Sequence, residues 1–241
     1  MSEAAKQIDA VIIHYNNPNQ LKRTAKGIIS TLGCRMTVVD NSDGVTAAGE
    51  ARAIAGELGA EYLATPANLG WGASINFWLS QASDPKPLTL IAAHDARLER
   101  FGVDDIMHAL SCKEVFAVSP ENGRNTVCRY SHARFFYFTQ RVPERLAYEV
   151  SVGHSTAILF KTQKIKSMRF DEEFFIYGCE SEIFIRAKDV GLKTYQSPSF
   201  QVRNLSTDSE QGLVSTAFLV NSLYCAHKHG GCSALFLGAF E

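Results

Sequence analysis

The chain of 241 residues has an ordinary composition for a globular protein, with 46% hydrophobic and 20% charged residues. Its 24 basic and 25 acidic residues leave a formal net charge of -1, so no broad positive field attracts nucleic acid or an anionic membrane. No run of about 18 apolar residues is present, and the first residues, MSEAAKQID, lack the apolar region of a signal peptide. These features exclude nucleic-acid binding and an integral membrane segment, and they predict a cytoplasmic protein that is at most peripheral at the inner face of a membrane.

The first hundred residues alternate between strand-like and helix-like segments. Continuous apolar runs, as expected for buried parallel strands, lie at residues 10–15, 36–40, 61–64 and 87–93. Helical patterns separate them, the first opened by Pro18 and the second ended by Gly59. This order predicts a parallel sheet with helices on both faces.

The second half mixes predicted strands with an acidic helix. Strand candidates are VFAVSP (115–120), TVCRYSHARFFYFTQRV (126–142) and SVGHSTAILFK (151–161). A helix follows at about Glu180, then a short strand near LKTYQSP (192–198) and a closing helical segment over about 212–229. No linker or repeat separates the halves, so we expect one shared core.

The six cysteines are spread along the chain without a C-x-x-C pair, at Cys34, Cys112, Cys128, Cys179, Cys225 and Cys232. This spacing argues against a zinc knuckle and against a redox dithiol. We expect these cysteines to be reduced and to pack as small apolar residues.

Polar residues follow each of the four predicted strands in the first half, at 14–16, 40–43, 65–68 and 94–95. In sheets of this kind, ligands bind outside the carboxyl ends of the strands. Asp40 heads the sequence DNSDG, where its carboxylate would either accept hydrogen bonds from a base or ribose, or close an Asx-turn. In NLGWGASIN (68–76), the two glycines either allow an anion to approach the backbone or only shape the turn into a helix.

Asp95 comes directly after a buried strand, in AAHDA. A single carboxylate there can hold Mg²⁺ or Mn²⁺ against a diphosphate, because these ions keep several waters. His94 would add a nitrogen ligand or, more commonly for a histidine at a strand end, make a hydrogen bond.

Glu180 and Glu182 fall in the first turn of the acidic helix, where the helix dipole favours negative charge. Glu182 and Arg186 have i,i+4 spacing, which predicts a solvated salt bridge. Glu180 has no cation at i+4 and aromatic neighbours before it, so it is either an ordinary helix-start acid or a base with a raised pKa.

Five segments in order resemble a family 2 glycosyltransferase of the GT-A fold, with the pattern of its rhamnosyltransferase-like members. They are VIIHYNN, VVDNSD, NLGWGASIN, HDARL and RFDEEFFIYGCESEIFIRAKDVG, and the match spans about residues 11 to 198. The resemblance implies a Rossmann-like, mostly parallel sheet flanked by helices, with a mixed acceptor-side half. Residues 1–100 would form the nucleotide-sugar-binding half and residues 101–241 the acceptor-binding and catalytic-base half of one continuous domain.

The resemblance also implies the activity. Such an enzyme transfers a sugar, rhamnose or another hexose, with inversion from a dTDP- or UDP-linked donor to a hydroxyl of a glycan or lipid-linked acceptor in polysaccharide biosynthesis. Asp40 matches the base-binding position, Asp95 the retained aspartate of the metal and diphosphate motif, and Glu180 the general base. We expect His14, Asn68 and Gly70 to complete the donor site, and a Mg²⁺ or Mn²⁺ ion on Asp95 is the implied cofactor.

Several residues depart from the family pattern. Cys179 replaces the first of two adjacent acids, Glu182 replaces an aspartate, and Ala93 stands where the metal motif usually begins with an acid or Asn. Arg203 and Asn204 occupy the region of a usual histidine, and Arg203 would then neutralise diphosphate charge directly. These departures leave a second hypothesis, a catalytically silent GT-A scaffold that binds nucleotide-sugar or glycan. A nucleotidyltransferase would need a glycine-rich phosphate loop with a basic residue, which HYNNPNQ does not provide.

Overall fold

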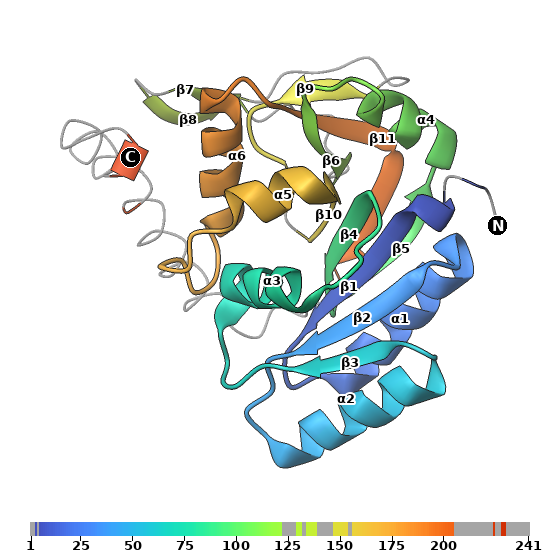
Figure 1. Cartoon of the computed structure of the whole chain (residues 1–241). Coiled ribbons are helices and arrows are strands. Elements are labelled where there is room, and N and C mark those ends of the chain that lie inside the picture. Colours follow the sequence, from blue (N-terminus) through green and yellow to red (C-terminus); the bar gives the residue numbers. More distant parts are fainter. Residues whose placement is uncertain are drawn as a thin grey trace.

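The computed structural model is organised around a nine-stranded sheet with helices on both faces (Figure 1). It describes residues 3, 5–121, 129–131, 134–138, 147–153, 156–204, 224, 228 and 229. After a short 3-10 helix (Ala5–Gln7), the first half consists of β1 (Ile8–His14), α1 (Pro18–Leu32), β2 (Arg35–Asp40), α2 (Val45–Glu57), β3 (Glu61–Ala64), α3 (Gly70–Gln81) and β4 (Leu88–Ala93). The predicted alternation of strands and helices is confirmed.

Two elements that the sequence pattern did not predict, β5 (Ala96–Phe101) and α4 (Val103–Leu110), lead into the second half. It continues with β6 (Val115–Glu121), β7 (Arg129–Ser131), β8 (Arg134–Phe138), β9 (Tyr148–Val150), β10 (Ala157–Lys161), α5 (Thr162–Met168), α6 (Cys179–Asp189) and β11 (Lys193–Asn204). The sequence ARLERF of β5 carries three charged residues on an edge strand, so it lacks the apolar run that marks the buried strands.

Three predictions in this half need correction. The single strand predicted over 126–142 is wrong, because its described part forms an antiparallel hairpin in which Ser131 pairs with Arg134. The strand predicted over 151–161 begins only at Ala157, and the strand predicted near 192–198 continues to Asn204. The closing helical segment predicted over 212–229 lies outside the described residues except for positions 224, 228 and 229.

The sheet is parallel in one half and mixed in the other, with the order β3-β2-β1-β4-β10-β6-β11-β5 and β9 beside β11. β1 runs parallel to β2 and to β4, and β2 runs parallel to β3. β10 is antiparallel to both β4 and β6, whereas β11 is parallel to β6 and antiparallel to β5. Because β10 pairs directly with β4, strands of both halves belong to one sheet, while the functional division at residue 100 stays a prediction.

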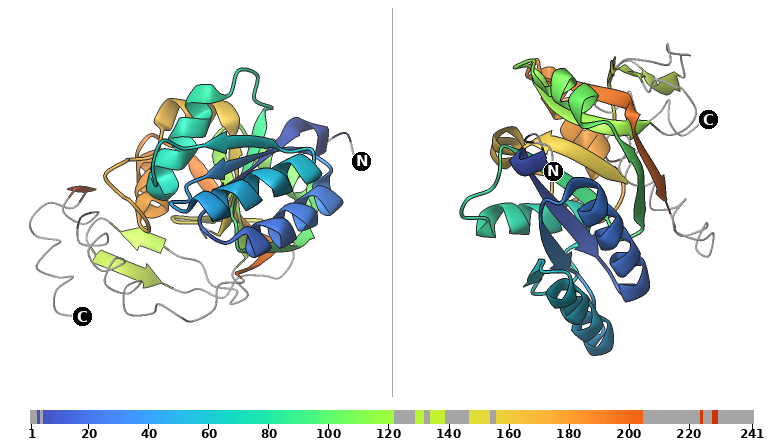
Figure 2. Two further views of the ribbon diagram at one scale, coloured as in Figure 1. Left: turned by 90° about the horizontal axis from the view of Figure 1, so that it is seen from below. Right: turned by 90° about the vertical axis from the view of Figure 1, so that its right-hand side faces the viewer.

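Two apolar clusters cover the two faces of the sheet. α1, α2 and α4 contribute to one cluster and α3, α5 and α6 to the other, and Figure 2 shows these helix layers on opposite sides. Side chains of β1 alternate between them, with Ile12 in the first and Val11 and Ile13 in the second. A strand buried on both faces is a nearly continuous apolar run, and a cluster of polar residues follows where β1 and β2 end. Within the described ranges, none of the helices has the length and apolarity needed to cross a bilayer.

Candidate functional site

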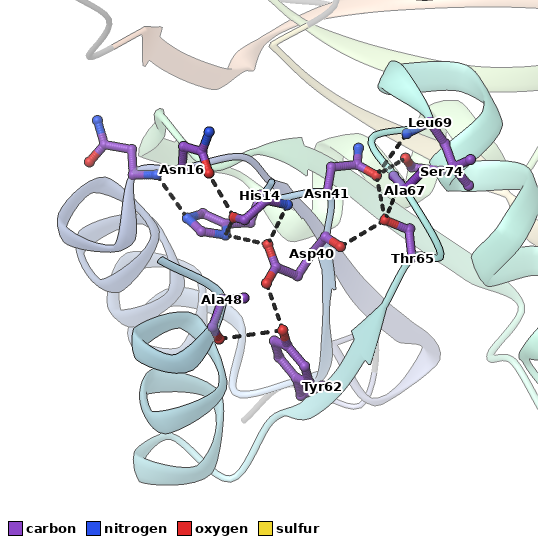
Figure 3. Close-up of polar contacts among 12 residues, drawn as sticks. His14, Asn16, Asp40, Asn41, Ala48, Tyr62, Thr65, Ala67, Leu69 and Ser74 are labelled. Carbon is purple, nitrogen blue, oxygen red and sulfur yellow. Dashed lines mark hydrogen bonds and ion pairs between the residues drawn. The ribbon is translucent and has the colours of Figure 1, made fainter. Parts of the chain in front are cut away.

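His14, the last residue of β1, lies at the centre of the polar residues at the carboxyl ends of the strands (Figure 3). Its side chain is fully buried, and Nδ1 lies 2.9 Å from Oδ1 of Asp40. The backbone N–H of Asn17 donates to Nε2 over 3.1 Å, so Nε2 carries no proton. The proton is therefore on Nδ1, where it is donated to Asp40.

Asp40, the last residue of β2, uses both carboxylate oxygens within the protein. Besides His14, the backbone N–H of Ser42 donates to Oδ1 over 3.0 Å and the Tyr62 hydroxyl donates to Oδ2 over 2.6 Å. Burial alone would raise the pKa of Asp40, but hydrogen bonds from His14, Ser42 and Tyr62 stabilise the carboxylate and lower its pKa to about 2. Burial, together with the neighbouring Asp40 carboxylate, raises the pKa of Tyr62 to about 12. Asp40 thus joins the ends of β1, β2 and β3, and its contact with a nucleotide base stays a prediction.

Asn41 connects this cluster to α3 and was not identified from the sequence. Its Nδ2 donates to the carbonyl of Gly70 over 3.0 Å, while its Oδ1 accepts from the hydroxyls of Ser74 over 2.8 Å and Thr65 over 2.9 Å. The side chain is buried, so an amide that donates and accepts in this way fixes the β3–α3 connection on the end of β2. The only sequence signal for this role is an asparagine directly after a strand-end aspartate.

The start of α3 packs against the loop between α5 and α6, residues 169–178, called here the α5–α6 loop. Gly70 has φ of 77°, and a Cβ atom at this position would lie 1.9 Å from the carbonyl oxygen of Phe175. The backbone N–H of Trp71 donates to the same oxygen over 2.9 Å, and that of Gly70 donates to Oδ1 of Asn68 over 3.1 Å. Because these amides are already bonded, the glycine serves close packing, and donor contacts by Asn68 and Gly70 stay predictions.

His94 and Asp95 form the turn between β4 and β5, next to His14. The rings of His94 and His14 meet edge to face with centroids 5.5 Å apart, and the backbone N–H of His94 donates to the carbonyl of Ile13. Burial lowers the pKa of His94, which favours the neutral ring. Among the described residues, none donates a hydrogen bond to the Asp95 carboxylate. The same residues contain no group of three metal-ligating side chains. A free carboxylate beside a neutral imidazole suits a divalent cation whose other ligands are water and diphosphate.

Arg203 lies on β11, which pairs with β5, the strand that begins directly after this turn. In the β11–β5 ladder Arg203 is opposite Arg97 and Asn204 is opposite Ala96, the residue that follows Asp95. The Nε atom of Arg203, however, lies 3.0 Å from Oε1 of Glu99 on the exposed edge of the sheet. To reach a diphosphate, Arg203 would have to exchange this partner, so its donor-binding role stays a prediction.

Glu180 is the second residue of α6, and the helix is preceded by Gly178, which has φ of 86°. Its side chain is buried, and this burial raises the pKa of the carboxyl above its ordinary value. Of the two alternatives left open by the sequence, the burial favours the carboxyl with a raised pKa, and the role of Glu180 as general base stays a prediction. The neighbouring Cys179 is fully buried, and burial raises the pKa of its thiol well above the ordinary value, so the thiol is not a nucleophile.

The solvated salt bridge predicted for Glu182 is wrong. The pair with Arg186 exists, with Nε 2.7 Å from Oε1, but the Glu182 side chain is completely buried. Nζ of Lys228 lies 3.3 Å and Nε2 of His229 lies 3.4 Å from the same oxygen. The correction has a tertiary cause, because residues far along the chain cover this part of α6.

These contacts bring most of the predicted site residues into one region. His14 contacts Asp40 and His94, Asn41 continues from Asp40 to Gly70, and Gly70 lies against the α5–α6 loop that leads to Glu180. Asp95 is adjacent to His94, whereas Arg203 is turned toward Glu99.

No known family model matches the sequence, and no curated protein matches it. Among solved structures, GalNAc-T7 with UDP, GalNAc and Mn²⁺ is similar over 94% of this chain and 48% of its own, with 12% identity and a TM-score of 0.74. TarS of S. aureus is similar over 90% of this chain and 38% of its own, with 13% identity and a TM-score of 0.58. Its 1-349 fragment with UDP-GlcNAc is similar over 90% and 65%, with 14% identity and a TM-score of 0.56.

The chain has the GT-A fold. At these identities the likeness shows the fold alone, and the chain spans less than half the length of the first two of these proteins. The predicted fold class, a GT-A sheet that is mostly parallel and flanked by helices, is confirmed. In this GT-A chain, the polar cluster around His14 lies at the carboxyl ends of the parallel strands, which is where open α/β sheets bind ligands.

Proposed function

We propose that the protein is an inverting glycosyltransferase that moves a sugar from a nucleotide-diphosphate donor to a hydroxyl of a glycan or lipid-linked acceptor. The observation that carries this proposal is the continuous set of contacts from His14 and Asp40, through Asn41 and Gly70, to the loop that precedes Glu180. It connects the strand ends of a GT-A sheet to a buried carboxyl with a raised pKa. A direct displacement needs these two parts, a donor site and one base.

In this reaction the hydroxyl oxygen of the acceptor attacks the anomeric carbon, and Glu180 takes the proton of that hydroxyl. The bond from the anomeric carbon to the diphosphate breaks on the opposite face, which inverts the configuration. Asp95 would hold Mg²⁺ or Mn²⁺, with His94 as the nearest nitrogen, and the ion when bound would neutralise charge on the leaving diphosphate. Arg203 is the alternative source of positive charge.

UDP is the first nucleotide to test, because the structures of GalNAc-T7 and the TarS fragment contain UDP or UDP-GlcNAc. The second nucleotide to test is dTDP, because the sequence resembles rhamnosyltransferase-like proteins, for which dTDP-rhamnose would be the donor. The aromatic-rich second half would receive the acceptor.

A catalytically silent GT-A scaffold is the second candidate. Ala93 replaces an expected acid, and the part of the chain that the structure describes contains no cluster of three metal ligands. Such a protein would bind the nucleotide-sugar and release no product.

A thermal-shift series with UDP, dTDP, GDP and CMP, each with and without Mn²⁺ and Mg²⁺, tests the donor site. A nucleotide at about 100 times its Kd adds about 2.7 kcal/mol, which is a rise of several degrees for a chain of this size. The nucleotide-sugar that carries the selected nucleotide is then incubated with the protein without acceptor. Release of free sugar indicates an enzyme, and no release indicates a silent scaffold. If no nucleotide shifts the folded protein, the proposal fails.

A further inference from the structure

Lys228 connects the two sides of the α5–α6 loop. Its Nζ forms an ion pair with the Asp171 carboxylate near the start of this loop, and it lies 3.3 Å from Oε1 of Glu182 in the first turn of α6. Asp171 is mostly buried and Glu182 is completely buried. Glu180 lies between these two carboxylates in the chain.

Two neighbours of Lys228 contact the same region. The ring of Tyr224 meets that of Phe174 edge to face, with centroids 5.0 Å apart, and Phe174 is fully buried in the α5–α6 loop. Nε2 of His229 lies 3.4 Å from Oε1 of Glu182, and the His229 side chain is only 11% exposed. The residues at 224, 228 and 229 therefore cover both the loop and the first turn of α6, and we call them the clasp.

Hydrogen bonds from the rest of the fold anchor the beginning of the α5–α6 loop. Arg186 donates to the carbonyls of Met168 over 2.8 Å and Arg169 over 2.6 Å. Asn76 of α3 donates to the carbonyl of Phe170 and accepts from its backbone N–H, each over 2.9 Å.

The end of the loop near Glu180 is strained. Tyr177 has φ of 59°, a conformation that a bulky residue rarely adopts and that surrounding contacts must maintain. The backbone N–H of Trp71 also contacts this end of the loop, because it donates to the carbonyl of Phe175. The clasp therefore contacts the α5–α6 loop that leads to Glu180, and it contacts Glu182 in the helical turn that contains Glu180.

We propose that Lys228 is a positioning residue, which holds the Glu180 carboxylate in place by bridging Asp171 and Glu182. This inference rests on the proposed function in one respect only, the role of Glu180 as base. The bridge itself is a structural claim, and it is testable without turnover.

The test uses the full chain with Lys228→Met, Lys228→Arg and the matched control Lys22→Met. The control removes a lysine of α1 whose Nζ lies 2.7 Å from Oε2 of Glu57 on α2. Two quantities are measured: kcat and donor KM for sugar release from the donor, and the rate at which a thiol reagent labels Cys179 in the native protein, followed by peptide mass spectrometry. Cys179 is fully buried next to Glu180, so its labelling reports movement of the loop.

We expect Lys228→Met to lower kcat by about 10- to 100-fold, because a displacement of about 1 Å has this effect. Donor KM should stay close to that of wild type, and Cys179 should be labelled at least about tenfold faster, since labelling follows the population of the open form. Lys228→Arg should restore both quantities, and Lys22→Met should change neither. If Lys228→Met does not fold, Asp171→Asn removes the other end of the bridge and takes its place.

Unchanged kcat in Lys228→Met, or faster Cys179 labelling without a loss of kcat, overturns the positioning role. Failure of the proposed function looks different. If Glu180→Gln turns over donor as wild type does, the base assignment is wrong whatever Lys228→Met does. If the wild type turns over no donor, the labelling rate alone decides, and Cys179 protection that is equal in wild type and Lys228→Met overturns the clasp.

Discussion

Nδ1 of His14 donates to Oδ1 of Asp40 over 2.9 Å, and neither side chain is more than 2% exposed. Since Nε2 accepts from the backbone of Asn17, the imidazole is held in one tautomer between the ends of two parallel strands. This pair joins the ends of β1 and β2.

Replacing Asp40 by Asn tests this pair. With its amide oxygen in the place of Oδ1, the variant still accepts from His14 and Ser42, but its NH₂ group then faces the Tyr62 hydroxyl, which loses its carboxylate acceptor. A pKa lowered from 3.8 to about 2 corresponds to about 2 kcal/mol of stability at neutral pH, and we expect this loss in urea unfolding. Asp43→Asn, at an exposed position of the same loop, is the control and should unfold as wild type does.

The same shift predicts a pH dependence. A carboxyl whose pKa is lower in the folded than in the unfolded protein stabilises the fold above the unfolded value and loses this effect on acidification. The difference in unfolding free energy between wild type and Asp40→Asn should therefore be full above about pH 4 and shrink as the pH falls toward about 2. A difference that grows with acidity would contradict the assignment.

Gly70→Ala should disrupt the contact between α3 and the α5–α6 loop. The new Cβ would overlap the carbonyl of Phe175, and φ of 77° disfavours alanine, so we expect a loss of about 2 to 4 kcal/mol. Gly49→Ala is the matched control, because Gly49 lies within α2 with no atom near its added Cβ. That substitution should stabilise the protein by about 0.5 to 1 kcal/mol in the same urea titration.

Glu180→Gln should separate activity from stability. Removing the base should lower kcat by about 10² to 10⁴-fold while nucleotide binding is kept. Because burial raises the pKa of Glu180 in the folded protein, the wild type loses stability as pH rises from the unfolded value, about 4.5, through the folded one, and glutamine avoids this loss. The variant should thus melt above wild type at pH 7 and equal to it near pH 4; a lower melting temperature at pH 7 would contradict the burial argument.

Asp95→Asn should remove the metal-dependent part of the nucleotide-induced thermal shift and leave the unliganded melting temperature unchanged. The second expectation follows because no described residue donates a hydrogen bond to this carboxylate. EDTA should act on wild type as Asp95→Asn does. If EDTA has no effect and Arg203→Gln abolishes the shift instead, Arg203 supplies the positive charge.

Some of the fold could be predicted because its signals are local. The apolar runs of β1, β2 and β4 need no tertiary information, since a strand covered on both faces is apolar over most of its length. The polar residues at their ends follow from the same pattern, which is why His14, Asp40 and Asp95 could be selected from the sequence. β5 was not predicted because an edge strand is half solvated and three of its six residues are charged.

Local sequence patterns were enough to predict the β-α alternation, the polar strand ends and the acidic first turn of α6. The surroundings of each polar group, in contrast, depend on contacts between distant parts of the chain. Asp40 accepts hydrogen bonds from His14, Ser42 and Tyr62. Gly70 packs against the backbone of Phe175, and Glu182 forms ion pairs with Arg186 and Lys228. The reason is physical: periodicity depends on neighbours a few residues apart, whereas burial, ion pairing and pKa depend on groups that only folding brings together.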